Sequence, residues 1–138
     1  MAKTTIRTKA WDSFSRYIRL RDALKTTGTK DSVECITCGA IKPSFGLGCA
    51  QAGHLIPGRT NSLLIDEKFV NSQCDHCNRG LKGNWVPYRR KMVEWYGEDA
   101  VKEVEDRKYI TKPMKKYEWQ EIIDTYKRKY EELCQTLE

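Results

Sequence analysis

The sequence predicts a small α+β protein with a zinc-stapled centre flanked by α-helices. Two Cys-x-x-Cys pairs, Cys35–Cys38 and Cys74–Cys77, frame the middle of the chain. Apolar residues recur at helical spacing near both ends, whereas the middle is rich in turn-forming residues. A length of 138 residues suits one modest hydrophobic core, so we treat residues 1–138 as a single domain.

The charge composition is compatible with a polyanionic partner. The formal net charge is +6, and 32% of the residues are charged. A basic protein can also simply be soluble, so the charge alone does not decide. No apolar run approaches the length of a membrane span and no signal peptide opens the chain, so we expect no membrane partner and a cytoplasmic location. Thiols stay reduced in that compartment and can bind metal.

The paired cysteines Cys35, Cys38, Cys74 and Cys77 predict one structural zinc ion per chain, because thiolates in two such pairs suit tetrahedral zinc. A disulfide pairing and a redox function are the alternatives. The absence of secretion signals disfavours the first, and the lack of a thioredoxin-like βαβ context disfavours the second. Four cysteine ligands close the coordination sphere, so we do not expect the zinc to be catalytic. Of the remaining cysteines, Cys49 is expected to be a buried thiol and Cys134 a packing residue beside the apolar face of the last helix.

The N-terminal segment 8–28 is predicted to form an amphipathic helix. Its apolar residues fall near helical spacing and are expected to pack on the zinc-bound centre: Trp11, Phe14, Ile18 and Leu24. Three arginines lie between them and would either be solvated or contact phosphate: Arg16, Arg19 and Arg21. Gly28 suits a left-handed cap. Residues 1–7 carry no pattern, so we expect a mobile basic arm.

The centre of the chain, residues 33–84, is predicted to consist of a cysteine turn, two strands and a short helix. In order, these are the turn at 33–41, strands at 49–56 and 69–72, and a helix at 75–82. His54 would lie on the first strand, and Asn78 would lie on the helix directly after the second cysteine pair.

The C-terminal region 85–138 is predicted to be helical. Residues 88–96 alternate basic and aromatic side chains, residues 98–108 form a short acidic helix, and residues 116–137 form the last helix. The last helix carries a nearly regular apolar face: Trp119, Ile122, Ile123, Tyr126, Tyr130, Leu133 and Leu137. This face would either fold back on the N-terminal helix or form a homodimer interface within residues 114–138, since aromatic residues are enriched in interface cores.

Three segments carry a family resemblance. They read K-A-W-D-S-F-S-R-Y-I-R-L-R-D at 9–22, Q-A-G-H-L-I-P-G-R at 51–59 and Q-C-D-H-C-N-R at 73–79. The order Cys-x-x-Cys, Gly-His on a strand, then Cys-x-x-Cys-Asn opening a helix resembles the zinc-bound ββα-metal (HNH-type) nucleases, and its layout is similar to endonuclease VII. Together the segments resemble the phage recombination endonuclease family called Rap or NinG, from about Lys9 to Gly97.

This resemblance implies a metal-dependent DNA endonuclease with an HNH-like core, acting on branched recombination intermediates such as Holliday junctions or D-loops in the cytoplasm of a phage host. His54 would be the general base, because the ordinary pKa of histidine lies near neutrality. Asn78 would be an oxygen ligand of a catalytic Mg²⁺ or Mn²⁺ ion. Asn71 would either brace the loop that carries the base or be an ordinary polar residue at a strand end.

One position departs from the family pattern. Many HNH nucleases carry an aspartate or a histidine directly before the base, as a second metal ligand, where this chain has Gly53. The pair Gly-His resembles the non-specific nucleases whose metal relies on one asparagine. A second oxygen would have to come from Asp66, Asp75 or Gln51, and the sequence leaves this choice open.

Basic residues near the predicted site are candidate DNA contacts: Arg59, Arg79, Arg89, Arg90 and Lys91. Solvated side chains on a packing helix are the alternative. Two other functions stay open, namely a general or site-specific HNH nicking endonuclease and a zinc-containing nucleic-acid-binding module without catalysis. A binding module would need neither His54 nor Asn78. His76, inside the second cysteine pair, is expected to be a surface residue.

Overall fold

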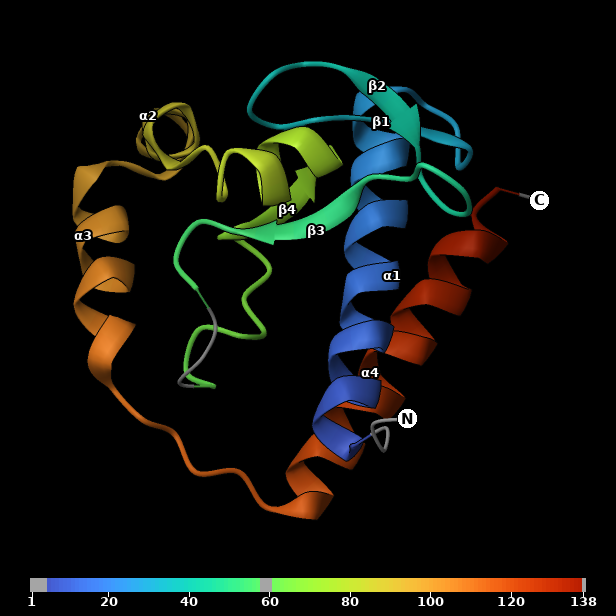
Figure 1. The fold of residues 1–138 in the computed structure, drawn as a ribbon. Helices are drawn as coiled ribbons and strands as arrows, with labels where there is room; N and C mark the ends of the chain where they lie inside the picture. Colours follow the sequence, from blue (N-terminus) through green and yellow to red (C-terminus); the bar gives the residue numbers. More distant parts are fainter. Residues whose placement is uncertain (1–4, 58–60, 138) are drawn as a thin grey trace.

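Two pairs of short antiparallel strands lie among helices in the structure (Figure 1). The structure is a computed structural model, and it describes residues 5–57 and 61–137. In chain order the elements are α1 (Ile6–Thr26), β1 (Ser32–Glu34), β2 (Ile41–Pro43), β3 (Gln51–His54), β4 (Val70–Gln73), the π-helical turn η1 (His76–Gly80), α2 (Trp85–Tyr96), α3 (Glu98–Asp106), the 3₁₀ turn η2 (Arg107–Tyr109) and α4 (Lys116–Gln135). The predicted mixed α+β class is confirmed. No helix among these described residues is both long and apolar enough to cross a membrane.

The long helix α1 confirms the helix predicted near the N-terminus. The hydroxyl of Thr5 caps it by accepting a hydrogen bond of 3.1 Å from the backbone N–H three residues later. The residues buried on its inner face follow helical spacing: Ala10, Phe14 and Ile18. A mobile arm was predicted for residues 1–7. This prediction is wrong for residues 5–7, because Thr5 caps α1 and the helix begins at Ile6. Residues 1–4 lie outside the described residues.

The strand pair β3–β4 corresponds to the two predicted strands and carries the candidate site. The strands are antiparallel, with His54 opposite Val70 and Gly53 opposite Asn71. Successive side chains of a strand point to opposite faces. Val70 accordingly packs in a cluster with α1 residues, whereas Asn71 reaches Tyr88 of α2. Helices therefore cover both faces of this pair.

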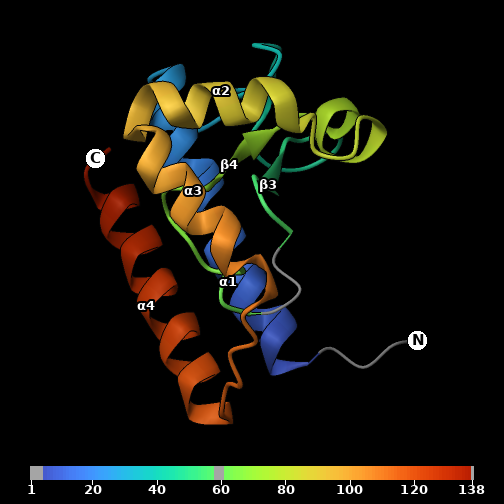
Figure 2. The same ribbon diagram turned by 90° about the vertical axis from the view of Figure 1, so that its left-hand side faces the viewer.

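Hydrophobic clusters on the two faces of β3–β4 join the strands to the helices. The cluster on the side of α1 and α4 contains Phe14, Ile18, Ala52, Val70 and Tyr126. The cluster on the side of α2 and α3 contains Leu55, Leu63, Phe69, Tyr88, Met92, Val101 and Val104. Figures 1 and 2 show α4 lying alongside α1, while α2 and α3 stand on the other side of the strands. The predicted segments 8–28, 33–84 and 85–138 thus pack against one another through the strand pair β3–β4.

The helix predicted at 75–82 is replaced by the shorter turn η1. Its defining hydrogen bond runs from the N–H of Leu81 to the carbonyl of His76, five residues back, at 2.7 Å. Lys82 and Asn84 have positive φ angles of 53° and 45°, and this left-handed backbone separates η1 from α2. A regular helix after the strand pair is therefore missing, so the HNH-like part of the predicted fold class is not established by the structure.

The last helix packs against α1 within the chain. Trp119, Ile123 and Tyr126 are buried, and the rings of Phe14 and Tyr126 meet edge to face with centroids 4.8 Å apart. Only the C-terminal end of the predicted stripe is open, with Leu137 46% exposed. The stripe is therefore used mainly inside the protomer, as the fold-back alternative expects. A homodimer through residues 114–138 stays a prediction, with a weaker argument behind it.

Candidate functional site

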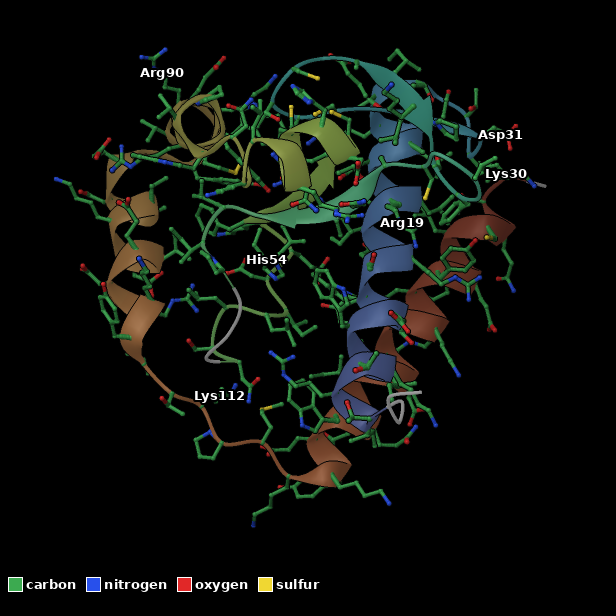
Figure 3. All side chains as sticks on the ribbon, in the orientation of Figure 1. Arg19, Lys30, Asp31, His54, Arg90 and Lys112 are labelled. Atoms are coloured by element: carbon green, nitrogen blue, oxygen red, sulfur yellow. The ribbon has the colours of Figure 1, made fainter. Side chains whose placement is uncertain are left out.

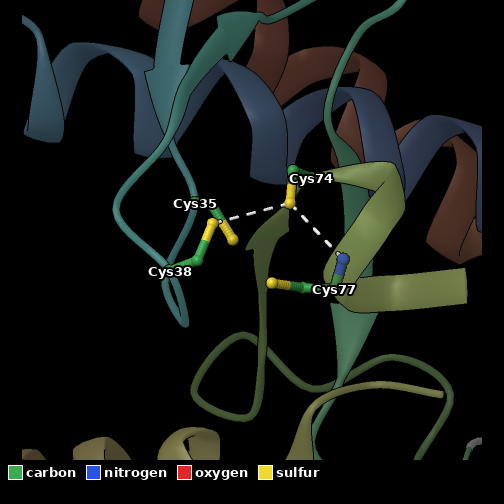
Figure 4. Close-up of side chains that lie close together, drawn as sticks. All are labelled: Cys35, Cys38, Cys74 and Cys77. Atoms are coloured by element: carbon green, nitrogen blue, oxygen red, sulfur yellow. Dashed lines mark hydrogen bonds between the residues drawn. The ribbon is translucent and has the colours of Figure 1, made fainter. Parts of the chain in front are cut away.

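The two cysteine pairs come together from separate segments of the chain. Cys35 and Cys38 lie between β1 and β2, Cys74 follows β4, and Cys77 lies in η1. The four sulfur atoms all lie within 4.8 Å of one another (Figure 4). Three of the residues are buried, and Cys38 is exposed. Zinc–sulfur distances are about 2.3 Å in tetrahedral sites, so these four sulfurs are close enough to hold one zinc ion.

Hydrogen-bond donors around the sulfurs favour the form that binds zinc. The N–H of Cys77 donates to Cys74 Sγ (3.4 Å), Asn84 Nδ2 donates to Cys77 Sγ (3.6 Å), and Thr37 Oγ1 lies 3.3 Å from Cys35 Sγ. Burial raises the pKa of Cys74, and it raises the pKa of Cys38 to about 12. Burial also acts to raise the pKa of Cys35, but hydrogen bonds from Thr37 and from backbone groups outweigh it and lower that pKa to about 6. Donors that stabilise thiolates suit a zinc site, so the cluster fits the predicted structural zinc.

A cleft of about 580 Å³ contains His54 and Asn78, two of the three predicted catalytic residues, whereas Asn71 does not line it. Its lining includes Arg7, Trp11 and Arg19 from α1, Gln51 and His54 from β3, and Asn78 from η1. Figure 3 shows His54 projecting below β3, with Arg19 on the neighbouring α1. Within residues 5–57 and 61–137, no aspartate or glutamate lines the cleft. The cleft is therefore basic and suits an anionic ligand.

Two contacts hold the His54 ring in one orientation. The ring stacks on Trp11, with centroids 4.7 Å apart and planes 21° apart, and His54 Nε2 lies 3.0 Å from the carbonyl oxygen of Leu64. A carbonyl only accepts, so Nε2 carries the proton of the neutral ring and Nδ1 is the nitrogen that can take one up.

The surroundings of His54 keep the ring neutral near pH 7. Burial lowers the pKa of His54 below its ordinary value of 6.5. The contact with the Leu64 carbonyl opposes this shift, the charge of Arg7 adds to it, and the charge of Asp66 opposes it. A neutral imidazole with an available nitrogen is what a general base requires.

A chain of side-chain hydrogen bonds orients Asn78. Asn78 Nδ2 donates to Gln51 Oε1 (2.6 Å), and Gln51 Nε2 donates to Asp75 Oδ1 (2.8 Å). Because an ionised carboxylate only accepts, this chain sets the orientation of both amides. Asn78 Oδ1 is then directed toward Gly53. An amide oxygen at the edge of a cleft suits a hard divalent cation, as predicted for Asn78.

The glycine at position 53 has a steric cause. A Cβ atom built on Gly53 would overlap Gln73 Oε1 and would lie 2.8 Å from Gln73 Cδ and 3.1 Å from Asn78 Oδ1. The aspartate or histidine found at this position in many HNH nucleases therefore has no room here.

The three residues considered as the source of a second oxygen are already engaged. Gln51 and Asp75 bond to each other, as described above. Asp66 Oδ1 accepts hydrogen bonds from the N–H groups of Lys68 and Phe69, and Asp66 Oδ2 lies 3.3 Å from Arg107 Nη2. Of the three, only Gln51 lines the cleft.

Asn71 is buried and is linked to the backbone of β3 through the hydroxyl of Tyr88. Asn71 Nδ2 donates to the hydroxyl of Tyr88 (3.2 Å), and that hydroxyl donates to the carbonyl of Gly53 (2.7 Å). Asn71 Oδ1 accepts a hydrogen bond of 3.1 Å from Arg21 Nη2. Contacts of this kind are what the predicted bracing role requires, and the role itself stays a prediction.

The described residues among the predicted DNA contacts come from two elements, η1 and α2. Arg59 lies outside the described residues. Arg79 directly follows Asn78 and is exposed, with its guanidinium 3.5 Å from Asp75. His76, on the same turn, is exposed as expected. Of the predicted set, Arg79 is thus the described residue that stands beside Asn78 in the chain.

The other three predicted contacts lie on α2. Arg89 bridges α2 and α3 by pairing with Glu98 (2.7 Å) and Glu105 (3.0 Å), so its charge is already partly neutralised. Arg90 points away from His54 (Figure 3), and Lys91 Nζ lies 5.8 Å from the centroid of the Trp95 ring. Their contact with DNA remains a prediction, and the glutamate pairing weakens it for Arg89.

Two cleft arginines lie on α1. Arg7 was not predicted to belong to the site, and Arg19 was expected to be either solvated or in contact with phosphate. Arg7 Nε donates to Asn61 Oδ1 (2.9 Å), and Arg19 Nη1 donates to the carbonyl of Ser44 (3.2 Å). Arg19 falls in the segment that carries the family resemblance, which was a usable signal. Nothing in the sequence marked Arg7, because its position depends on where α1 begins. Cys49 also differs from expectation: it is half-buried rather than buried, and Arg19 Nη1 lies 3.5 Å from its sulfur.

The fold and the site define a mixed α+β protein with four clustered cysteines that could hold a zinc ion. A family model described as "Bacteriophage Lambda NinG protein" matches residues 3–136. The chain therefore belongs to the NinG family.

Curated relatives match over 98 residues, which is 70% of this chain. Protein ninG of Escherichia phage 933W is 31% identical, that of Escherichia phage lambda 30%, and that of Salmonella phage P22 32%. The match covers 43%, 42% and 42% of these relatives, so the chain spans less than half of their length. No solved structure matches. The predicted NinG resemblance is confirmed, whereas these matches do not establish the recombination endonuclease.

Removal of one cysteine tests the zinc cluster. Cys74→Ser should lose zinc and unfold the centre of the protein, because structural zinc contributes on the order of 10–16 kcal/mol, about as much as or more than the net stability of a domain. Cys134→Ser, on α4 and outside the cluster, is the control and should keep about one zinc per chain. Elemental analysis measures the zinc content of both variants, and thermal unfolding measures their stability. Folded wild-type protein without zinc would contradict the assignment.

Substitution of Gly53 tests the crowding next to Asn78. Gly53→Ala should lower the free energy of unfolding by about 1–3 kcal/mol, since the new methyl group overlaps the buried side chain of Gln73. Gly80→Ala is the matched control, because its nearest neighbour is the exposed side chain of His76, at 3.2 Å, which can turn away. Urea denaturation of both variants measures the difference. Equal stabilities would show that the strands adapt to a side chain at position 53.

Proposed function

We propose that this protein is a divalent-metal-dependent DNA endonuclease in which His54 activates a water molecule. The observation that supports this most is the convergence of His54 and Asn78 on one basic cleft, although they come from β3 and η1. Arg7 and Arg19 line the same cleft and provide positive charge for a phosphodiester. His54 presents Nδ1 as its accepting nitrogen, which is the arrangement that a base needs.

The proposed reaction is hydrolysis of a phosphodiester bond. Water transfers one proton to His54 Nδ1 while its oxygen attacks the phosphorus atom. The bond from phosphorus to the leaving ester oxygen breaks, and that oxygen takes a proton from the solvent. Trp11 and the Leu64 carbonyl keep the imidazole in place, and their fixed geometry favours proton transfer because little reorientation is needed.

Asn78 is the residue that we assign to a Mg²⁺ or Mn²⁺ ion. When bound, such an ion would stabilise negative charge on the phosphate and on the leaving oxygen. The amide of Asn78 is oriented by Gln51 and lines the cleft, with its oxygen on the side of Gly53, so the residue fits an ion that prefers oxygen ligands.

The substrate and the alternatives rest on different arguments. Branched recombination intermediates, such as Holliday junctions or D-loops, are proposed from the family resemblance alone. A general or site-specific nicking enzyme would use the same site. A nucleic-acid-binding module without catalysis is the other candidate, and the orientation of His54 in a basic cleft favours the enzyme. Incubation with Mg²⁺ or Mn²⁺ and a four-way junction, a linear duplex or single strands, followed by mapping of the cuts, separates these functions.

Loss of the base should remove cleavage while leaving the protein intact. His54→Ala should reduce the cleavage rate by about 10²–10⁴-fold, the usual contribution of a general base, and should keep zinc and DNA binding. His76→Ala, on the exposed side of η1, is the control and should cleave like the wild type. Cleavage rates, zinc content and DNA affinity are measured together. Wild-type cleavage by His54→Ala would place the reaction elsewhere.

The pH dependence of cleavage should report the lowered pKa of His54. The neutral ring is the active form, so kcat/KM should rise with pH, reach half its maximum below pH 6.5 and level off near neutrality. The same lowered pKa makes the folded state lose stability as pH falls below 6.5, because the unfolded chain then binds the proton more readily. Zinc content is measured at each pH as the control. A half-maximum above pH 6.5 would contradict His54 as the base.

A further inference from the structure

Gln73 on β4 has a buried amide whose orientation is fixed. Its side chain is fully buried, and Gln73 Nε2 donates to Thr37 Oγ1 (3.1 Å) and to the carbonyl of Gly83 (2.8 Å). A backbone carbonyl can only accept, so the amide nitrogen must be the atom that faces Gly83. Gln73 Oε1 therefore faces the other way, toward Gly53.

This oxygen has no hydrogen-bond partner within residues 5–57 and 61–137. Buried polar side-chain atoms nearly always have one, so an unpaired amide oxygen requires a reason. A Cβ atom on Gly53 would overlap Gln73 Oε1 and would lie 3.1 Å from Asn78 Oδ1. Two amide oxygens, each on an amide whose nitrogen is bonded elsewhere, thus lie next to Gly53, between the cleft residues Ala52 and His54.

We infer that Gln73 is a second oxygen ligand of the divalent cation that Asn78 binds. This inference rests on the cation assigned in the proposed function. Mg²⁺ and Mn²⁺ take oxygen ligands and keep several waters, so two amide oxygens beside a phosphate are sufficient. The oxygen that many HNH nucleases take from the residue before the base comes here from the neighbouring strand. Glycine at position 53 makes room for it.

The structural alternative is that Gln73 Oε1 only accepts a weak contact from the Cα–H of Gly53. In that case Gln73 would hold Thr37 and Gly83 together without any interaction with a cation. The two readings differ in the effect of removing the oxygen. Cation affinity falls if Gln73 Oε1 is a ligand, and it stays unchanged if this oxygen only contacts Gly53.

The experiment measures Mn²⁺ affinity by the electron paramagnetic resonance signal of the free ion, on zinc-loaded protein without DNA. The cysteine cluster does not interfere, since thiolates prefer zinc to manganese. Gln73→Leu removes the oxygen and should weaken Mn²⁺ binding about tenfold, and Gln73→Glu replaces it by a carboxylate and should strengthen binding about tenfold. Ser72→Ala is the matched control, because Ser72 is also buried on β4 with an unpartnered hydroxyl, but is adjacent in the strand and so on its opposite face. It should bind Mn²⁺ like the wild type.

A double substitution tests whether the two residues share one ion. The factor by which Gln73→Leu weakens Mn²⁺ binding should differ between the Asn78→Ala background and the wild type, because ligands of one ion are coupled. Zinc content and circular dichroism show which variants are folded. If Gln73→Leu does not fold, Gln73→Glu decides, through Mn²⁺ affinity and the rise in melting temperature on adding Mn²⁺. A Gln73→Glu protein with wild-type affinity, or a folded Gln73→Leu protein with wild-type affinity, would overturn the inference.

The outcome is separable from that of the proposed function, because no cleavage is measured. Gln73-dependent Mn²⁺ binding in a protein that cuts no DNA would retain the cation site and reject the nuclease. Cleavage by a protein whose Mn²⁺ affinity is unchanged by substitution of Gln73 would retain the nuclease and reject Gln73 as a ligand.

Discussion

The convergence of four cysteine sulfurs is the constraint on which the candidate site depends. It joins the β1–β2 turn to the end of β4, segments that are far apart in the sequence. Three residues at or near the candidate site are next to these cysteines in the sequence. Gln73 precedes Cys74, Asn78 follows Cys77, and Thr37 lies between Cys35 and Cys38. The hydrogen bond from Gln73 to Thr37 shows the consequence, since it spans the two halves of the cluster. A zinc ion there would fix the amide oxygens near Gly53 as well as the turns themselves.

A second set of contacts positions β4, the strand paired with the one that carries His54. Asp22 of α1 is buried, and its Oδ2 accepts a hydrogen bond of 2.7 Å from the N–H of Ser72. Its neighbour Arg21 donates to the carbonyl of Glu67 (2.6 Å) and pairs with Asp22 at 2.9 Å. Helix α1 therefore does more than cover the strands. It sets the position of β4 through buried Asp22 and half-buried Arg21, and loss of either would be costly because it leaves an unpaired partner.

The sequence predicted the parts of this protein that depend on local patterns. Two Cys-x-x-Cys pairs require only their own spacing, and α1 and α4 follow from the recurrence of apolar residues at helical intervals. The turn η1 could not be predicted as such, because the surrounding cysteine cluster and the left-handed Lys82 override the local preference for a helix. Arg89 was read as a DNA contact because its glutamate partners come from α3, whose placement is not local. His54 and Asn78 were found through a family resemblance, and Gln73 was missed because its function depends on which face of β4 it occupies.

Amide hydrogen exchange before and after removal of zinc by a chelator tests most directly whether the cysteine cluster holds the candidate site. The N–H groups of Asn78 and Leu81 bond to the carbonyls of Cys74 (2.9 Å) and His76 (2.7 Å), so both should exchange slowly in zinc-loaded protein. The account predicts that zinc removal strips this protection from Asn78 and Leu81, while amides in the middle of α1, around Phe14, are affected least. Unchanged protection of Asn78 and Leu81 in zinc-free protein would contradict it.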